Sequence, residues 1–406
     1  NQYSWGLFFS RDVFLAPWEK LFIWMLDICF IISAFLFYMN RKNKIFSFVF
    51  VKLIGMNSIV LICSLIILEM VFGNWFNSNN LNRLNIIKDQ AIHYNLQGLY
   101  PSENDDILYT RDKWGFRGEY SDVATIDILT VGGSTTDQRY ISDGYTFQDI
   151  LRKEFQKSDK DVNVVNAGID GQSTIGHIKN FDWWFPNITE LKVRYFLFFI
   201  GVNDFFIDNN HSYDDLLGES LHPIEVALKT KSALYYLYKT ITGIRLAHTY
   251  GLTHNPGHSR KNFTTTNWVN HPALSNYREL MKNRLIAYEE RLDILCKKVK
   301  SAGAIPIFVT QSQRRCYVFI DGNLYGKPRM GRYNGQLYNG VDYYHMIRML
   351  HEKTKKVCIK NSGIFIDLDN ELDFDIKIDF YDFAHTTPSG SEKIGKYFYK
   401  KLNYLF

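Results

Sequence analysis

Residues 130–140 read TVGGSTTDQRY, a stretch that joins a predicted strand to a glycine turn. The preceding residues 126–131 read IDILTV, and such an apolar run is typical of a strand buried in a sheet. Gly132 and Gly133 allow the backbone to turn sharply, and Ser134 follows them directly. This order predicts a serine hydroxyl exposed at the carboxyl end of a buried strand.

The rest of the chain alternates short apolar runs with long amphipathic segments. The predicted strands are residues 126–131, 162–166, 193–200, 304–310 and 363–367, and the predicted helices lie near 145–157, 172–184, 274–302, 338–360 and 389–403. Strands separated by helices favour a parallel sheet, because parallel strands need crossover connections that are usually helical. The pattern therefore predicts an α/β fold with a five-stranded parallel sheet covered on both faces.

Two segments exceed the usual length of a connection, residues 205–273 and 311–337. We interpret both as insertions that shape substrate choice. The second begins after the fourth predicted strand with two amides and two cations, so we expect Gln311, Arg314 and Arg315 to bind substrate.

The N-terminal region contains two long apolar runs, at about residues 18–39 and 48–72, which are long enough to be transmembrane helices. Asp27 lies inside the first run, where a carboxylate is costly unless it faces a partner helix. A helical hairpin buried in a soluble core is the alternative. The predicted organisation is a membrane anchor over 1–75, a connector over 76–106 that is partly helical around 81–94, and a soluble domain over 107–406.

A short cationic loop separates the two runs. Residues 40–44 read NRKNK, and the positive-inside rule places such a loop in the cytoplasm. With two spans, both ends of the anchor then face outward. The soluble domain is therefore predicted to be extracytoplasmic, and periplasmic in a Gram-negative cell.

The composition excludes several classes of protein. The chain has 406 residues, of which 46% are hydrophobic and 22% charged, with a formal net charge of +5. Its cations are scattered, without the basic stripe that nucleic-acid binding needs. The five cysteines include no CxxC pair, which leaves room for at most one disulfide in the soluble part. The histidines show no metal-ligand spacing, so we expect no metal site.

Polar clusters follow the predicted strands at their carboxyl ends. Strand one ends at Ser134, strand two runs into a loop with Gly168, and strand three is followed by Asn203. After the fifth strand come Asp382 and His385. Because ligands of open parallel sheets bind beyond the carboxyl ends of the strands, we expect these residues to meet at one edge.

Together these residues form a set suited to acyl transfer. His385 can accept the proton of the Ser134 hydroxyl while Asp382 orients the imidazole. The N–H groups of Ser134 and Gly168 and the Asn203 amide can stabilise an oxyanion. Each residue alone is also compatible with a turn or a helix cap, so the prediction depends on their combination.

At this point the chain resembles the SGNH hydrolases, also called the GDSL esterase/lipase family. Four blocks match in order, VGGST, NAGIDGQST, IGVND and DFAHTTPSG, and the resemblance covers about residues 107–404. It implies a flavodoxin-like three-layer α/β/α fold. Gly133 stands where the eponymous GDSL block has Asp. The Trp114-Gly-Phe-Arg-Gly118 stretch is similar to the GFRG that precedes GGSTT in membrane-attached bacterial members.

The resemblance implies a serine hydrolase with Ser134 as nucleophile, His385 as base and Asp382 as its orienter. Ser134, Gly168 and Asn203 would form the oxyanion hole, and no metal or organic cofactor would be needed. An outward-facing, membrane-anchored member resembles enzymes that add or remove acetyl groups on cell-envelope polysaccharides, some beside a membrane-bound O-acyltransferase. A lipid or general carboxylester hydrolase, and a non-catalytic subunit of a membrane assembly, are the alternatives.

Overall fold

The computed structural model describes residues 48–73, 75, 84, 86, 88–96, 98–102, 105–207, 231–235, 237–238 and 267–406. The chain divides into two compact units. One comprises residues 1–82 and 220–253, and the other comprises residues 83–219 and 254–406. The predicted boundaries of anchor, connector and hydrolase domain stay predictions.

The N-terminal unit contains helix α3, Phe48–Phe72, which has the bounds of the second predicted transmembrane run. Several of its apolar side chains are exposed, including those of Ile59, Ile66 and Val71. Within the described part of the chain, no helix is long and apolar enough to span a membrane. The helix is thus confirmed but its transmembrane placement is not, and the first predicted run lies outside the described residues.

The other unit is built on a five-stranded parallel sheet. Its strands are β3 (Ile126–Gly132), β4 (Val164–Asn166), β5 (Val193–Ile200), β6 (Ile305–Thr310) and β11 (Ile364–Ile366), in the order β11-β6-β5-β3-β4. All five correspond to predicted strands. After β3 the chain adds β4 on one side of that strand and β5 on the other, so the order of the strands changes direction between β3 and β5. Ligands of open α/β sheets bind at such a switch point.

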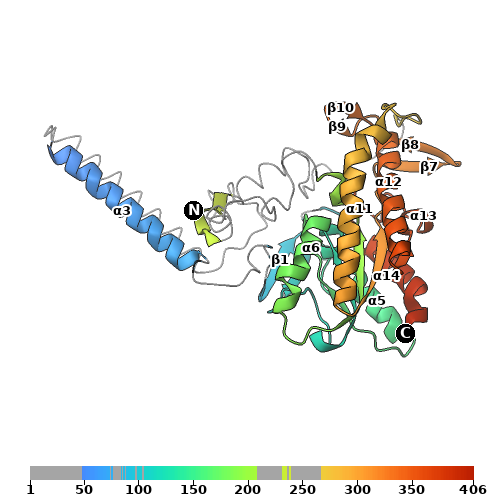
Figure 1. Cartoon of the computed structure of the whole chain (residues 1–406), viewed down its shortest axis with the longest axis horizontal. Helices are drawn as coiled ribbons and strands as arrows, with labels where there is room; N and C mark the ends of the chain where they lie inside the picture. The colour runs from blue at the N-terminus through green and yellow to red at the C-terminus, as the bar shows by residue number, and fades with distance from the viewer. Residues whose placement is uncertain are drawn as a thin grey trace. The chain divides into compact units, whose positions relative to one another are not determined.

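Helices cover both faces of the sheet, as predicted (Figure 1). Helices α5 (Phe147–Gln156) and α14 (Pro388–Leu402) pack together on one face. Helices α6 (Thr174–Trp183), α11 (Tyr277–Ser301) and α12 (Gly340–Lys360) pack together on the other. Local signals explain several helix starts: Thr146 and Asp149 form a capping box at α5, and Thr387 caps α14 before Pro388.

Strand β5 shows why its sequence lacks polar alternation. On one face, the Phe199 ring lies 5.9 Å from the ring of Phe147 in α5 and 6.2 Å from that of Phe398 in α14, between centroids. On the other face, the Phe196 ring lies 4.9 Å from the ring of Phe181 in α6. Both faces of the strand are buried, so apolar residues occupy successive positions.

A hairpin of β1 (Gln90–Asn95) and β2 (Asp106–Arg111) precedes the sheet. The expectation of helix around residues 81–94 is wrong for 90–94. The antiparallel pairing with β2 buries Tyr94, whose ring lies 5.7 Å from that of Tyr109 and 5.5 Å from that of Tyr140. This packing comes from distant residues, and the polar local sequence did not indicate it.

The second predicted insertion, 311–337, forms two small hairpins. Strands β7 (Tyr317–Ile320) and β8 (Asn323–Gly326) make one, and β9 (Gly331–Tyr333) and β10 (Gln336–Tyr338) make the other. Both follow β6 at the carboxyl edge of the sheet (Figure 1). Most of the first predicted insertion, 205–273, lies outside the described residues.

Candidate active site

The turn after β3 places Ser134 at the start of the short helix α4, Ser134–Asp137. Gly133 precedes it, and a Cβ atom at that position would overlap Nδ2 of Asn203 and approach the Gln172 carbonyl oxygen to 3.0 Å. The Asn203 amide therefore occupies the space that a side chain at position 133 would need. This packing is a physical reason for glycine in the GGST block.

Ser134, His385 and Asp382 form a continuous hydrogen-bonded chain. The Ser134 hydroxyl lies 2.7 Å from Nε2 of His385, and Nδ1 of the same ring lies 2.6 Å from Oδ2 of Asp382. Because an ionised carboxylate only accepts hydrogen bonds, Nδ1 donates to Asp382 and leaves Nε2 to accept from the serine hydroxyl. The structure thus brings these three predicted residues together in the predicted order.

The loop that carries the histidine is held from several sides. Oδ1 of Asp382 accepts backbone hydrogen bonds from Ala384 at 2.9 Å and His385 at 2.7 Å. The Tyr381 ring stacks on the imidazole, with centroids 5.6 Å apart and an angle of 9° between planes. The side chains of Asp382 and His385 keep 22% and 13% of their surface exposed, so solvent and substrate can still reach the pair.

Opposing effects set the pKa of His385. Burial lowers the pKa, while the charge of Asp382 and its hydrogen bond raise it, and the net result is a pKa above the usual 6.5. Asp170 adds a further raising effect, and Arg139 a lowering one. The Asp382 carboxylate therefore stabilises the imidazolium that forms when a histidine takes a proton.

The predicted oxyanion donors lie around helix α4. Asn203 belongs to helix α7, Val202–Phe205, and its Nδ2 donates to the Gln172 carbonyl oxygen at 2.8 Å. Because a side-chain amide has two N–H groups, the second remains for a ligand. Gly168 also lies against α4, since a Cβ there would overlap the backbone nitrogen of Asp137. Its own N–H, however, donates to Oδ1 of Asn166 at 2.9 Å.

Buried charged residues that were not among the predicted site residues fix this arrangement. Nη2 of Arg111 donates to Oδ1 of Asp137 at 2.6 Å and to the Gly168 carbonyl oxygen at 2.5 Å. Arg117, from the GFRG stretch, donates to the carbonyl oxygens of Asp137 and Ile141. These arginines connect α4 to the Gly168 loop. The GFRG stretch thus stabilises the segment that follows Ser134 through the hydrogen bonds of Arg117, a role that its sequence alone did not indicate.

The three predicted substrate-binding residues have partners inside the domain. Gln311 is buried: its Oε1 accepts from the N–H of Val202 at 2.7 Å, and its Nε2 donates to the Thr135 hydroxyl at 2.6 Å. Arg315 is also buried and donates to the carbonyl oxygens of Phe380 and Tyr381 at 2.6 and 2.9 Å.

Arg314, the third of these residues, donates to the Asp369 carbonyl oxygen, and its guanidinium lies 5.8 Å from the centre of the Tyr317 ring. The geometry thus gives no support to substrate contact by Gln311, Arg314 or Arg315. Gln311 and Arg315 instead position the Asn203 helix and the His385 loop.

Among the described residues, no group of three or more His, Cys, Asp or Glu side chains is arranged to hold a metal ion. The cysteines at positions 63, 296, 316 and 358 are free. The hydroxyl, imidazole and carboxylate of the site form the hydrogen-bonded chain described above. Such a chain can remove the serine proton during attack on an acyl carbon and return it to the leaving group.

Comparison with known proteins identifies one family. The model of the GDSL-like lipase/acylhydrolase family matches residues 128–398. No curated protein sequence matches the chain.

The comparison with solved structures gives matches of low sequence identity. The psychrotrophic esterase EstA from Pseudoalteromonas sp. shares 12% identity, with 69% of this chain and 97% of that chain covered at a TM-score of 0.37. A variant of Axe2, an acetyl xylan esterase from Geobacillus stearothermophilus, shares 12% identity, and the match covers 68% of this chain and 94% of that chain at a TM-score of 0.38. LAE5, an α/β hydrolase enzyme from the Lake Arreo metagenome, shares 13% identity, and the match covers 70% of this chain and 100% of that chain at a TM-score of 0.38.

Proposed function

The chain belongs to the GDSL-like lipase/acylhydrolase family and is a serine hydrolase that acts on esters. From this premise we propose that it is an O-acyl esterase or O-acyltransferase that works through an acyl-serine intermediate, with acetyl groups of a cell-envelope polysaccharide as its substrate. The 2.7 Å contact between the Ser134 hydroxyl and Nε2 of His385 is the observation that carries the proposal.

In the first step, Oγ of Ser134 attacks the acyl carbon while its proton passes to Nε2 of His385. Asp382 stabilises the resulting imidazolium. The carbonyl π electrons move onto oxygen, where the Ser134 N–H and the Asn203 amide can donate hydrogen bonds. The N–H of Gly168 can also donate to this oxygen if it gives up its hydrogen bond to Oδ1 of Asn166. Collapse of this intermediate expels the sugar hydroxyl oxygen, which takes the proton from His385.

The second step decides between hydrolysis and transfer. A hydroxyl group, from water or from an acceptor, gives its proton to Nε2 of His385 and attacks the acyl-serine carbon. Collapse returns the proton to Oγ of Ser134 and releases either free acid or a new ester. The two outcomes use the same protein groups, so they differ only in which hydroxyl reaches the acyl carbon.

The carbohydrate substrate is supported by the position and composition of the hairpins β7–β8 and β9–β10. They follow β6 at the edge of the sheet that carries the site, and they are rich in glycine. The partly exposed Tyr325 and the cations Lys327, Arg329 and Arg332, which lie in or between them, suit polar, ring-shaped ligands. A lipid or general carboxylester hydrolase is the second candidate, favoured by the exposed apolar side chains of Phe319 and Ile320 on β7.

We also propose that the N-terminal unit attaches the enzyme to the bacterial cytoplasmic membrane, with the hydrolase unit on the outer side and a membrane-bound O-acyltransferase as a candidate partner. The exposed apolar side chains of α3 and the cationic residues 40–44 support this placement. Alkaline carbonate should leave the full-length chain in the membrane pellet. Release into the supernatant would contradict the proposal.

The catalytic proposal is tested with 4-nitrophenyl acetate. Ser134→Ala should lower the rate by at least about 10³-fold, because the nucleophile is lost. Ser301→Ala, at the exposed end of α11, is the matched control and should match wild type. Equal rates for Ser134→Ala and wild type would overturn the mechanism. If a fluorophosphonate fails to label wild type while labelling a general esterase, the chain is instead a non-catalytic subunit.

Acetyl release from an acetylated polysaccharide, compared with transfer to an added oligosaccharide, distinguishes esterase from transferase. Free acetate as the main product identifies the esterase, and a newly acetylated oligosaccharide identifies the transferase.

A further inference from the structure

A cluster of buried tyrosines connects the β1–β2 hairpin to the two segments that carry Ser134 and His385. Its members come from the hairpin, from the loop after α4 and from the loop before His385, and we call them the tyrosine cluster: Tyr94, Tyr100, Tyr109, Tyr140 and Tyr381. Residues far apart in the chain thus meet in one aromatic cluster that reaches both parts of the catalytic chain.

Tyr381 contacts the imidazole of His385 directly. The two rings are nearly parallel, with 9° between their planes and 5.6 Å between their centroids. The backbone N–H of Tyr381 also donates to the carbonyl oxygen of His385 at 3.1 Å. Burial raises the pKa of the Tyr381 hydroxyl well above its usual value, so the tyrosine stays neutral. Because the face of a neutral tyrosine ring attracts a cation, this contact favours the imidazolium over the imidazole.

Tyr100 connects Tyr381 to the segment of the nucleophile. Its ring stacks against that of Tyr381, with 5.9 Å between centroids and 30° between planes. Its hydroxyl donates to the carbonyl oxygen of Tyr140, in the loop after α4, the helix that begins at Ser134. A single residue of the hairpin therefore contacts the loop of the base and the segment of the nucleophile.

Two further tyrosines hold the hairpin against the nucleophile segment. The Tyr109 hydroxyl donates to Oδ1 of Asp137, the last residue of α4, at 2.9 Å. The Tyr94 ring lies 5.5 Å from that of Tyr140, between centroids. With the hairpin fixed at these points, Tyr100 presents a defined surface to Tyr381.

We propose that Tyr381 and Tyr100 are positioning residues of the ester reaction. Tyr381 directs the His385 imidazole towards the Ser134 hydroxyl and stabilises the charge that the imidazole gains when it takes the serine proton. Tyr100 holds the Tyr381 ring in place. The inference rests on the proposed acyl-serine mechanism, and it makes Tyr100, within the segment predicted to be a connector, necessary for full activity.

The surroundings of His385 make the effect of the ring measurable. Besides burial, the groups that act on the pKa of His385 are Asp382, Asp170 and Arg139. Phe383 also approaches the imidazole, with 6.4 Å between centroids and 73° between planes. A substitution of Tyr381 leaves these groups in the chain, so a change in the pH dependence of catalysis reports on the tyrosine ring.

Hydrolysis of 4-nitrophenyl acetate by the full-length chain, followed against pH, tests Tyr381. Tyr381→Met keeps an apolar side chain over the imidazole but removes the ring. We expect kcat to fall about tenfold or more while KM stays within about twofold, because the base is held less well. The rise of kcat/KM should move to lower pH by about half a unit or more, because the imidazolium loses its contact with the ring.

Two variants that keep the shape of the ring sharpen this test. Tyr381→Phe retains the ring face and should keep the wild-type pH profile, with kcat within about threefold of wild type. Pentafluorophenylalanine in place of Tyr381 has an electron-poor face, so it should shift the profile to lower pH as Tyr381→Met does. This variant provides the answer even if Tyr381→Met does not fold.

Tyr100 is tested in the same assay. Tyr100→Leu removes the stacked ring and the hydrogen bond to Tyr140, so kcat should fall about tenfold with KM within about twofold. Its pH profile should stay that of wild type, because Tyr100 acts on the imidazole only through Tyr381. Tyr100→Phe keeps the ring and should lose no more than about threefold in kcat, the effect of one hydrogen bond.

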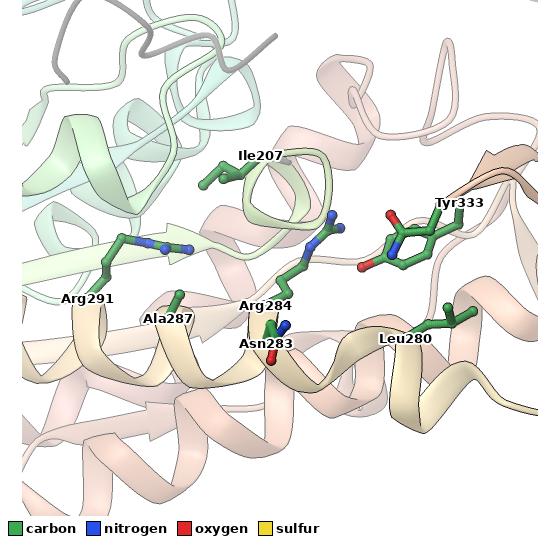
Figure 2. A pocket seen from close by; sticks show the side chains of 8 residues that line it. Ile207, Leu280, Asn283, Arg284, Ala287, Arg291 and Tyr333 are labelled. Carbon is green, nitrogen blue, oxygen red and sulfur yellow. The ribbon is translucent and has the colours of Figure 1, made fainter. Parts of the chain in front are cut away.

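Tyr333→Leu is the matched control for the loss of a buried tyrosine. Tyr333 lines a pocket along α11 (Figure 2), and its ring packs 5.6 Å from that of Phe205 and 6.4 Å from that of Tyr338, between centroids. The substitution should lower the thermal unfolding midpoint and leave the pH profile unchanged. A shift as large as that of Tyr381→Met would make the shift a general result of destabilisation and overturn the proposal.

The remaining outcomes separate this proposal from the mechanism on which it rests. If Ser134→Ala is inactive while Tyr381→Met keeps the wild-type kcat and pH profile, the mechanism stands and the role of Tyr381 is overturned. Tyr381→Phe as impaired as Tyr381→Met would also overturn it, since the ring face would then contribute nothing. A wild-type kcat in Tyr100→Leu would overturn the role of Tyr100.

Discussion

The imidazole Nε2 of His385 lies 2.7 Å from the hydroxyl oxygen of Ser134, although 251 positions separate the two residues in the chain. The contact exists because the turn after β3 and the loop before α14 meet at the carboxyl edge of one sheet. Each side has its own support: Gly133 and Asn203 pack at the serine turn, and Arg315 binds the histidine loop. These supports can therefore be tested one at a time.

Asp382→Asn tests the orientation of the imidazole. The variant keeps an oxygen for the backbone N–H groups of Ala384 and His385, but its amide can donate to Nδ1 and so favour the wrong tautomer. We expect kcat on 4-nitrophenyl acetate to fall by about 10²–10⁴-fold, with little change in the thermal unfolding midpoint. A large loss of stability with normal kcat would mean that Asp382 acts mainly on the loop.

The pH profile should reflect the raised pKa of His385. Burial lowers this pKa, but Asp382 raises it more, so the pH at which half of the His385 side chains are protonated lies above 6.5. A protonated imidazole cannot act as a base, so kcat/KM should rise with pH and reach half its plateau above pH 6.5. The Asp382→Asn variant lacks the carboxylate charge that raises the pKa of His385, so the rise of kcat/KM should move to lower pH. An unchanged profile in the variant would contradict this assignment.

The same raised pKa links protonation to stability. The folded state favours protonated His385, so this group contributes stability that is full below about pH 6.5. The contribution disappears as pH rises through the folded-state pKa. Activity and this part of the stability should therefore change in opposite directions with pH.

The strands and the catalytic set were predictable because their signals are local. The apolar run before Ser134 and the uniformly apolar β5 indicate buried parallel strands, and the clusters after them must lie at one edge. The side-chain directions of Gln311 and Arg315 were not predictable in this way. Gln311 turns inward because the N–H of Val202, on a neighbouring segment, needs a buried partner, and that need depends on the strand order.

Gly133 and Asn203 should be energetically coupled. Alanine at position 133 would displace the Asn203 amide, so Gly133→Ala should lower kcat by about 10²-fold, comparable to the loss of one oxyanion donor. Asn203→Ala should cost about 10²–10³-fold. Because Asn203→Ala removes the overlapping atoms, adding Gly133→Ala to it should cost about threefold or less. Independent, multiplicative effects in a double-mutant cycle would contradict the packing explanation.

Arg315 provides a direct test between positioning and substrate binding. Arg315→Met removes the donors to the carbonyl oxygens of Phe380 and Tyr381, which lie just before Asp382. Left without these donors, the loop should lose about 1–3 kcal/mol of stability and hold His385 less well. We expect kcat on 4-nitrophenyl acetate to fall about tenfold or more while KM stays within about twofold, because geometry and not affinity is affected.

Arg194→Met is the matched control for Arg315→Met. Arg194 also donates to a backbone carbonyl, that of Leu405 at 3.2 Å, but it is exposed and lies at the start of β5, the edge of the sheet opposite the site. It should leave kcat and KM at wild-type values, since surface contacts of this kind contribute little. A raised KM with normal kcat in Arg315→Met would return Arg315 to the substrate-binding role predicted from the sequence. Loss of kcat together with a lower unfolding midpoint would instead establish that its contacts position the His385 loop.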